Sequence, residues 1–349
     1  MVKKRILISG NEAIAEGAIQ AGCNFYAGYP ITPQNELIAY MAKHMPLSGG
    51  VFIQAESELA AINMVYGASA AGARAMTSSS SPGISLKQEG ISYISGSQLP
   101  AVIVNIMRGG PGLGNIAPAQ SDYFQATRGG GHGDYHLIVL APASVQEAYD
   151  LTQTGFYLAD KYRIAVMILG DGILGQMMEP LKLSTGKIKA PILKPWALTG
   201  CKGRKPNIVK SFFLREGDLE KFNLKLQKNY EIIRKKEARY EDLLLDDAKL
   251  ILVAYGTMAR IAKSALNKLR LAGKKVGLIR PISLWPFPEK AFQPRNKKVK
   301  YLAVEMSYGQ MVEDVRLAVN GYAQVDFLGR SGGGIPSEEE IIKRVNKLI

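Results

Sequence analysis

The sequence predicts an α/β protein: a doubly wound parallel sheet followed by a smaller second α/β domain. The first observation is that short, nearly continuous apolar runs alternate with helix-like segments through most of the first 186 residues. Strands that are apolar throughout are typical of parallel sheets covered on both faces. The second observation is that this alternation resumes near residue 247, with enough strand-like runs for a small separate domain.

The first domain, residues 1–186, is expected to alternate strands and helices throughout. Its strands are short apolar runs bounded by Gly, Pro, Ser or Asn, and its helices show apolar residues at spacings of three and four. The expected strands are residues 5–9, 24–28, 51–54, 74–77, 101–107, 137–140 and 165–169. Helices are expected over residues 12–21, through 36–41, and after Ser57, Pro82 and Ser144.

The rest of the chain is expected to form a connecting segment and a second domain. Residues 187–246 are Lys-rich and irregular, and they contain apolar residues at the spacings of one amphipathic helix: Phe222, Leu226, Tyr230, Ile233, Tyr240 and Leu244. Residues 247–349 contain strand-like runs within 249–257 and at 276–279, 301–305 and 325–328. Ser337, followed by three glutamates, is expected to cap a final helix.

Composition indicates a globular protein with a sizeable core. Of 349 residues, 47% are hydrophobic and 21% are charged, and no apolar run approaches the length of a membrane span. The start of the sequence lacks the apolar core of a signal peptide, so we expect a cytoplasmic protein with no membrane role. Cys23 and Cys201 are the two cysteines, too few for a disulfide framework or for an iron–sulfur cluster held by this chain alone.

The formal charge of +14 raises the question of nucleic-acid binding. Half of this excess lies between Cys201 and Arg239, where 12 Lys and Arg stand against 5 Asp and Glu. That segment overlaps the expected amphipathic helix, so its charge is better explained as a solvated helix face. We expect no nucleic-acid role, and an acidic redox partner would use the same charge.

The stretch from Val51 to Gly72 is the most informative part of the sequence. A buried strand is followed by Ser57, a suitable N-cap, and Glu58 then falls in the first helical turn, where the helix dipole favours negative charge. The helix that follows has almost no polar face, so Glu58 lies at the mouth of an apolar interior. The carboxylate either caps the helix or holds a polar atom of a ligand.

Polar residues follow other strands of the same expected sheet. Thr32, the serine run 78–81 and Arg108 each stand just after a strand, and ligands of parallel sheets bind at the carboxyl ends of strands. A guanidinium after seven apolar or small residues needs a partner. The partner of the Arg108 guanidinium is either the carboxylate of a substrate or a carboxylate of this chain.

Several familiar motifs are absent or incomplete. Gly110, Gly112 and Gly114 are interrupted by Pro111, which fits poorly with a dinucleotide-binding loop. No metal site is expected in this chain, and its histidines do not form a ligand set. Gly170-Asp171-Gly172 resembles the start of the thiamine diphosphate signature, but the asparagine that completes it is missing, so Asp171 is interpreted as a turn residue.

Taken in order, five motifs resemble the α subunit of 2-oxoacid:ferredoxin oxidoreductases. They are residues 29–33 (YPITP), 56–58 (ESE) before the small-residue helix, 77–83 (TSSSSPG), 107–111 (MRGGP), and the pair 280–288 (RPISLWPFP) and 305–310 (EMSYGQ) in the second domain. This resemblance implies a pyrimidine-type thiamine diphosphate-binding domain and a transketolase C-terminal-like domain.

By the same resemblance, Glu58 matches the glutamate that hydrogen-bonds the aminopyrimidine ring of the cofactor, with Glu56 as a nearby alternative. Thr32 matches a substrate-binding threonine, and Arg108 matches the residue that pairs with the 2-oxoacid carboxylate. Tyr29 and Pro30 fall in the matching cofactor-binding loop.

The resemblance also implies cofactors and partners. Thiamine diphosphate would be shared with a β subunit that holds its diphosphate and Mg²⁺, and γ and ferredoxin-like δ subunits would complete the complex, with iron–sulfur clusters on partner subunits. Ferredoxin and coenzyme A would be co-substrates. This allocation fits the missing asparagine and the two cysteines.

The substrate expected from the resemblance is a branched-chain 2-oxoacid such as 3-methyl-2-oxobutanoate. Residues 33–34 and 81–86 favour this substrate over 2-oxoglutarate, which would need a second cation, and Lys87 could supply one. A non-catalytic assembly scaffold is the alternative of another class.

Overall fold

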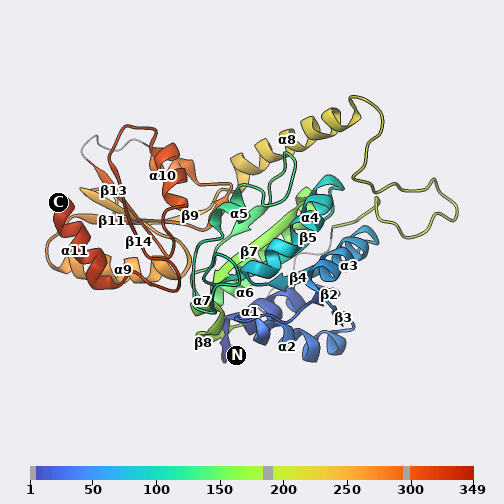
Figure 1. Cartoon of the computed structure of the whole chain (residues 1–349), viewed down its shortest axis with the longest axis horizontal. Helices are drawn as coiled ribbons and strands as arrows, with labels where there is room; N and C mark the ends of the chain where they lie inside the picture. The colour runs from blue at the N-terminus through green and yellow to red at the C-terminus, as the bar shows by residue number, and fades with distance from the viewer. Residues whose placement is uncertain (1–4, 184–191, 294–298) are drawn as a thin grey trace.

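The computed structural model describes residues 5–183, 192–293 and 299–349, and it contains one main sheet in each half of the chain (Figure 1). The expected boundary at residues 186 and 187 lies outside the described residues. The first half runs β1 (Arg5–Ser9), α1 (Gly10–Gln20), β2 (Phe25–Gly28), α2 (Asn35–His44), a 3-10 turn (Pro46–Ser48), β3 (Val51–Gln54), α3 (Glu58–Ala70), β4 (Ala75–Ser79), α4 (Ser81–Gly96), β5 (Ala101–Met107), α5 (Tyr123–Thr127), β6 (Ile138–Leu140), α6 (Val145–Tyr162), β7 (Ala165–Asp171), α7 (Gly172–Gln176) and β8 (Met178–Lys182).

The sheet of the first half has the strand order β12-β6-β7-β5-β4-β2-β3, and its neighbouring pairs are parallel except β12 with β6. The central strands β4, β5 and β7 are buried along their whole length, as near-continuous apolar runs require. Helices α3 and α4 pack together on one face, and α1, α2 and α6 pack on the other (Figure 1). The predicted doubly wound sheet is confirmed. Strand β1 lies outside it and pairs antiparallel with β8.

The second half has its own five-stranded sheet, in the order β14-β13-β10-β11-β9. All its pairs are parallel except β9 with β11. Ser337 caps the last helix in a reciprocal capping box with Glu340, as predicted. The elements are α8 (Asp218–Glu237), β9 (Tyr240–Leu243), β10 (Leu250–Val253), α9 (Gly256–Leu271), β11 (Val276–Pro281), β12 (Ser283–Trp285), a 3-10 turn (Glu289–Phe292), β13 (Lys300–Glu305), α10 (Met311–Val319), β14 (Val325–Gly329) and α11 (Glu338–Leu348).

The predicted amphipathic helix is present as α8, but it is shorter than the apolar spacing suggested. Leu226, Tyr230 and Ile233 are buried on one face as expected, and the helix ends at Glu237. Tyr240 instead begins β9, which gains an edge position against β11. The backbone N–H and C=O groups of these residues form hydrogen bonds with β11 and not within a longer helix. The spacing of apolar residues alone therefore placed the C-terminus of the helix too late.

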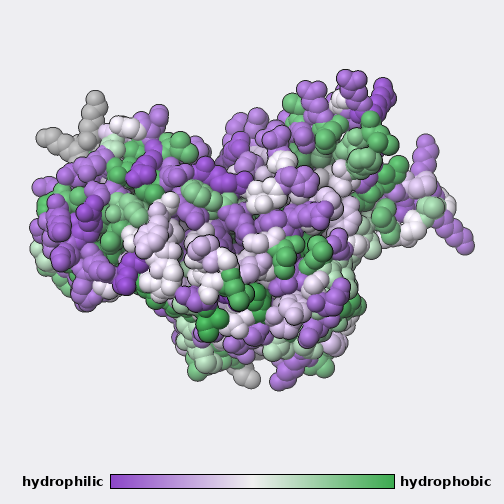
Figure 2. Space-filling model, viewed as in Figure 1, coloured by the Kyte–Doolittle hydropathy of each residue, from purple (hydrophilic) through white to green (hydrophobic). Residues whose placement is uncertain are grey.

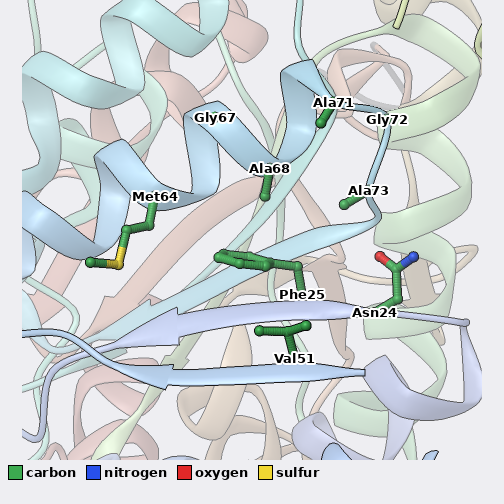
Figure 3. Close-up of a pocket in the computed structure, with 9 residues that line it drawn as sticks. All are labelled: Asn24, Phe25, Val51, Met64, Gly67, Ala68, Ala71, Gly72 and Ala73. Carbon is green, nitrogen blue, oxygen red and sulfur yellow. The ribbon is translucent and has the colours of Figure 1, made fainter. Parts of the chain in front are cut away.

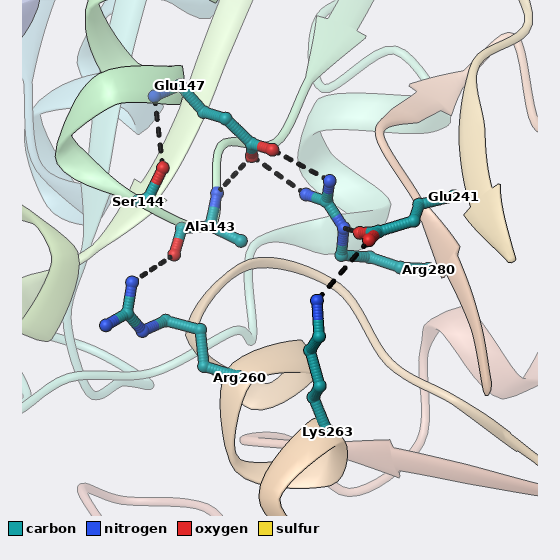
Figure 4. A network of polar contacts seen from close by, with 7 residues as sticks. All are labelled: Ala143, Ser144, Glu147, Glu241, Arg260, Lys263 and Arg280. Carbon is teal, nitrogen blue, oxygen red and sulfur yellow. Dashed lines mark hydrogen bonds and ion pairs between the residues drawn. The ribbon is translucent and has the colours of Figure 1, made fainter. Parts of the chain in front are cut away.

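Strand β12 joins the two halves of the chain. Ser283 to Trp285 leave the second domain and pair antiparallel with β6 of the first sheet. Beside this crossing, Arg280 makes two hydrogen bonds of 2.8 Å to the Glu147 carboxylate of α6 and one of 2.8 Å to Glu241 of β9 (Figure 4). The two domains are therefore held together by both a strand pairing and a partly buried ionic contact.

Apolar side chains also gather on the surface over the segment that precedes α8 and over the start of that helix (Figure 2). None of the helices within the described ranges has the length and hydropathy needed to cross a membrane.

Candidate active site

The candidate site lies at the carboxyl ends of the four neighbouring strands β5, β4, β2 and β3. Because these strands are parallel, the segments that follow them emerge at one edge of the sheet. The segments carry Arg108, the serine run, Thr32 and Glu58, respectively. These polar residues, expected from the sequence to lie at one edge of the sheet, do follow neighbouring parallel strands at that edge.

Glu58 is buried at the start of α3. Ser57 caps this helix by accepting a hydrogen bond from the backbone N–H of Ala60, and Glu58 occupies the first turn with a relative exposure of 6%. Its carboxylate makes no hydrogen bond to any described residue. Capping of α3 is therefore done by Ser57, which leaves the Glu58 carboxylate available for a ligand.

Gly83, in the first turn of α4, makes room for the Glu58 carboxylate. A Cβ atom at residue 83 would lie 2.5 Å from Oε1 of Glu58 and would also clash with Oγ of Ser79. Any other residue would push the carboxylate or the serine away. The TSSSSPG motif therefore contributes space as well as hydroxyl groups.

Several buried polar atoms at this sheet edge and in α4 lack hydrogen-bond partners in the described part of the chain. They are Oγ1 of Thr77, Oγ of Ser79, Oγ of Ser80, Nζ of Lys87 and Nε of Arg108. Buried polar groups are normally paired, and a cluster of unpaired ones marks a site where a polar ligand completes the bonding. The cluster lies at one strand edge and on the first two turns of α4.

Arg108 follows β5 directly and is 6% exposed. Its guanidinium donates hydrogen bonds of 3.0 Å to the backbone carbonyl oxygens of Thr32 and Leu113. No ion pair with a carboxylate forms within the described residues, so the internal salt bridge considered from the sequence is not present there. The positive charge is held in place by neutral acceptors, and one guanidinium N–H remains free.

Thr32 contacts Arg108 through its carbonyl oxygen, and its hydroxyl accepts a hydrogen bond of 3.2 Å from the side chain of Asn35. Tyr29 and Pro30 are exposed in the same loop after β2. The structure brings Thr32 and Arg108 into direct contact. The first turn of α4 lies between them and Glu58: its Gly83 packs against the Glu58 carboxylate, and its Ser81 donates to the Arg108 carbonyl at 3.3 Å.

Sequence reasoning missed the groups that hold this turn. Asp122 accepts hydrogen bonds from the Ser81 hydroxyl at 2.6 Å and from the Asn105 side chain at 2.9 Å, and burial raises its pKa. Asn105 was detectable as a lone amide in an apolar strand, whereas Asp122 carried no local signal. Behind the loop, buried Gln34 accepts from Ser78 at 2.6 Å, and Ser78 bonds Tyr26 at 2.6 Å.

Asp171 has a structural role. Its carboxylate accepts hydrogen bonds from the backbone N–H groups of Ile173 and Leu174 at the start of α7, and from the Thr257 hydroxyl of the second domain at 2.8 Å. Burial raises its pKa against these bonds. These contacts agree with the interpretation of Asp171 as a turn residue. Among the described residues, no group of three or more His, Cys, Asp or Glu could hold a metal ion.

A pocket of about 610 Å³ opens at the other end of the same strands (Figure 3). Asn24, Phe25 and Val51 line it from the amino ends of β2 and β3, and the remaining wall is the C-terminal half of α3 with the loop after it. Its lining has no charged side chain and lies away from Glu58. The pocket therefore offers no chemistry for a reaction site.

Comparison with known families identifies the fold and the family of this chain. A family model for the thiamine diphosphate-binding part of pyruvate flavodoxin/ferredoxin oxidoreductases matches residues 16–238. A second model, for core domain II of pyruvate:ferredoxin oxidoreductase, matches residues 248–341. The chain belongs to the 2-oxoacid:ferredoxin oxidoreductase family.

Individual relatives agree with this assignment along nearly the whole chain. The ketoisovalerate oxidoreductase subunit VorB of Methanothermobacter marburgensis is 50% identical over 98% of this chain and 97% of its own length. The 2-oxoglutarate synthase subunit KorA of Methanothermobacter thermautotrophicus is 36% identical over 98% of both. The family predicted from the motifs is thereby confirmed.

Solved structures agree as well. The 2-oxoglutarate:ferredoxin oxidoreductase of Magnetococcus marinus, with 2-oxoglutarate, coenzyme A and succinyl-CoA bound, superposes with a TM-score of 0.88 at 28% identity. The match covers 99% of this oxidoreductase chain and 65% of that one. A split-gene transketolase matches with a TM-score of 0.58 at 13% identity, which shows that the fold is transketolase-like.

Proposed function

We propose that this chain is the α subunit of an enzyme that oxidatively decarboxylates a 2-oxoacid, forms acyl-CoA and carbon dioxide, and passes electrons to ferredoxin. The observation that carries the proposal is the buried Glu58 carboxylate, unpaired among the described residues, at the same sheet edge as an Arg108 guanidinium that neutral acceptors hold. Thiamine diphosphate supplies the carbanion-stabilising chemistry when it is bound.

The residues at the sheet edge fit the pyrimidine end of that cofactor. Glu58 would share a hydrogen bond with the ring nitrogen in a largely buried site, where such a bond is strong. Gly83 leaves the space that this carboxylate needs, and the unpaired serine hydroxyls supply further polar contacts. Glu56 is exposed and is the weaker candidate for the same role.

Arg108 and Thr32 would bind the substrate. A guanidinium with a free N–H pairs well with the planar carboxylate of a 2-oxoacid, and the contact to the Thr32 carbonyl fixes its position. The Thr32 hydroxyl lies in the same loop and offers one further hydrogen bond to the substrate. Tyr29 and Pro30 complete the cofactor-facing side of this loop.

The remaining parts of the enzyme belong to partner subunits. A β subunit would hold the diphosphate and Mg²⁺, and γ and ferredoxin-like δ subunits would complete the complex, with the iron–sulfur clusters on partners. This division agrees with the two cysteines of this chain and with the structural use of Asp171. The complex is proposed to work in the cytoplasm.

The proposal includes the domain limits. Residues 1–186 form the cofactor domain, 187–246 the connecting segment with α8, and 247–349 the second domain. Strand β9 of the connecting segment contributes the edge of the second sheet.

The substrate proposed here is 3-methyl-2-oxobutanoate, with other branched-chain 2-oxoacids. The 50% identity with VorB favours it over 2-oxoglutarate. The structure adds a second reason, because Lys87, the candidate cation for a second substrate carboxylate, is fully buried on the side of Glu58. A second carboxylate could reach it only by displacing the packing of α4.

The test is to co-purify the complex from its host and to assay it with ferredoxin and coenzyme A against a panel of 2-oxoacids. We expect kcat/KM for 3-methyl-2-oxobutanoate to exceed that for 2-oxoglutarate by at least tenfold. The reverse order would assign the 2-oxoglutarate alternative. Turnover that is unchanged after Glu58→Gln would favour a scaffold role for this chain.

A further inference from the structure

The loop at residues 109–122 connects Arg108 to α5 and folds back on itself. Arg108 and Pro118 form an antiparallel bridge, so the end of the loop returns to the residue from which it started. Gly114 has a φ of +62°, and a Cβ atom there would overlap the Gly109 carbonyl oxygen. The glycines that interrupt the dinucleotide-like motif therefore allow a tight backbone fold, and this fold keeps Pro118 next to Arg108.

The second domain grips this loop through Gln120, two residues after Pro118. The Gln120 side chain is fully buried. Its backbone N–H donates to the Met306 carbonyl at 2.8 Å, and its side-chain oxygen accepts from the Met306 N–H at 3.1 Å. Its side-chain nitrogen donates to the Tyr255 carbonyl at 3.0 Å, and its own carbonyl accepts from the Tyr255 hydroxyl at 3.2 Å. The second domain thus fixes both the backbone and the side chain of Gln120.

The part of the loop before Gln120 also contacts the second domain. The Asn115 side chain donates to the Gly332 carbonyl at 3.0 Å. Gly333 leaves room for this approach, because a Cβ atom there would lie 2.6 Å from the side chain of Ala117. A run of glycines in the second domain therefore lets the loop lie directly against it.

The residues after Gln120 are bonded to both domains. Gln310 of the second domain donates to the Ser121 carbonyl at 2.7 Å and accepts from the Phe124 N–H at 2.8 Å. Between these two residues, Asp122 accepts a hydrogen bond of 2.6 Å from the Ser81 hydroxyl of α4. One short segment of chain therefore links the second domain to the first turn of α4.

These contacts bear on Arg108 because the loop also holds its guanidinium. Arg108 donates to the Leu113 carbonyl, which lies in the exposed stretch 111–116. An exposed loop moves readily unless packing or hydrogen bonds fix it. The fixed points are the bridge at Pro118 and the buried bonds of Gln120.

We propose that Gln120 is a positioning residue through which the second domain holds Arg108 in its substrate-binding position. The second domain would then contribute to substrate affinity although it lies outside the sheet edge that carries Arg108 and Glu58. The inference rests on the proposed function, in which Arg108 pairs with the carboxylate of the 2-oxoacid.

The first test is Gln120→Met in the assembled complex. Methionine keeps the length of the side chain and removes its hydrogen bonds to Tyr255 and Met306. If Arg108 is then correctly placed about one tenth of the time, KM for the preferred 2-oxoacid rises about tenfold. The value of kcat should stay within about twofold, because saturating substrate restores the bound position. A general loss of structure would instead lower kcat.

The second test is amide hydrogen exchange of the full chain without substrate or cofactor. The N–H groups of Gly109 and Asn115 are bonded within the loop at 2.9 and 3.0 Å. Their exchange should be about tenfold faster in Gln120→Met, because the loop opens more often. The matched control is Arg280→Lys, which weakens the domain junction at another place. It should change neither the exchange of the loop nor KM.

Both readouts must change in Gln120→Met and neither in the control; any other result overturns the proposal. If Gln120→Met does not fold, Gln310→Met replaces it, since this partly exposed side chain bonds the same segment. The same two changes are then required. Full activity of Glu58→Gln would refute the proposed function, whereas exchange without substrate shows separately whether Gln120 holds the loop.

Discussion

The two domains place the same residue types at their strand ends and use them differently. In the second domain, the fully buried Glu305 accepts hydrogen bonds from the backbone N–H groups of residues 310, 311 and 312 and from the Ser307 hydroxyl. In the first domain, Glu58 is almost as buried and has no hydrogen bond to a described residue. Glu305 therefore caps α10, and Glu58 caps nothing.

The arginines show the same contrast. Arg280 pairs with two carboxylates through three hydrogen bonds, whereas Arg108 has two carbonyl acceptors and a free Nε. Both are 6% exposed, so burial does not distinguish them. What separates a structural charge from one available to a ligand is whether the protein itself completes the hydrogen bonds.

The largest effect should come from Glu58→Gln in the assembled complex. Loss of the carboxylate should lower kcat by about 10²–10⁴-fold, the usual contribution of a proton-transferring group. Stability should change little, because Ser57 alone caps α3. Steady-state kinetics and thermal unfolding of the same preparation check both, and a large loss of stability would contradict the comparison.

Glu305→Ala should have the opposite profile. It leaves three backbone N–H groups at the start of α10 without an acceptor, which should cost about 3 kcal/mol of folding free energy. Urea unfolding of the full chain measures this loss. At a temperature where the variant stays folded, the complex should keep near-normal kcat, and a kcat as low as that of Glu58→Gln would contradict this role.

Lys87→Met should change how stability depends on pH. Burial lowers the pKa of Lys87 from 10.5 to about 8 in the folded chain, so between these pH values the unfolded chain binds a proton that the folded chain does not. With respect to Lys87, the folded state is therefore most stable above pH 10.5, and it loses this stability as pH falls from 10.5 to 8. The wild type should therefore gain about 3 kcal/mol relative to Lys87→Met between pH 8 and 10.5. Denaturant unfolding at several pH values measures the difference, and a pH-independent difference would show that Lys87 is not buried as described.

Arg108→Lys and Arg280→Lys form the last and smallest contrast. The first should raise KM for the 2-oxoacid about tenfold, because an ammonium cannot reproduce the planar contact to a carboxylate, and should leave stability nearly unchanged. The second should cost about 1–2 kcal/mol at the domain junction without raising KM. Substrate kinetics and unfolding of both variants separate the roles, and equal KM effects would remove the distinction.

Sequence patterns predicted most of the architecture because they are local. The apolar runs placed the strands, Ser57 and Ser337 were recognised as caps, and Arg108 was identified as a charge at the end of an apolar strand. Local patterns misled where a distant partner decided the outcome. Helix α8 ends at Glu237 because the residues that follow pair, as β9, with the edge of β11. Residues 283–285 form a strand because they pair with the edge of β6.

By itself, the sequence determined the fold class, the family motifs and the residues that stand at the strand ends. Only the tertiary structure decided which of those charges are satisfied. Arg280 finds Glu147 across 133 positions of sequence, and Gly83 and Gly90 let α4 approach Glu58 and Ile62 of α3 closely. Hydrogen-bond completion depends on contacts between distant segments, and no local pattern records those contacts.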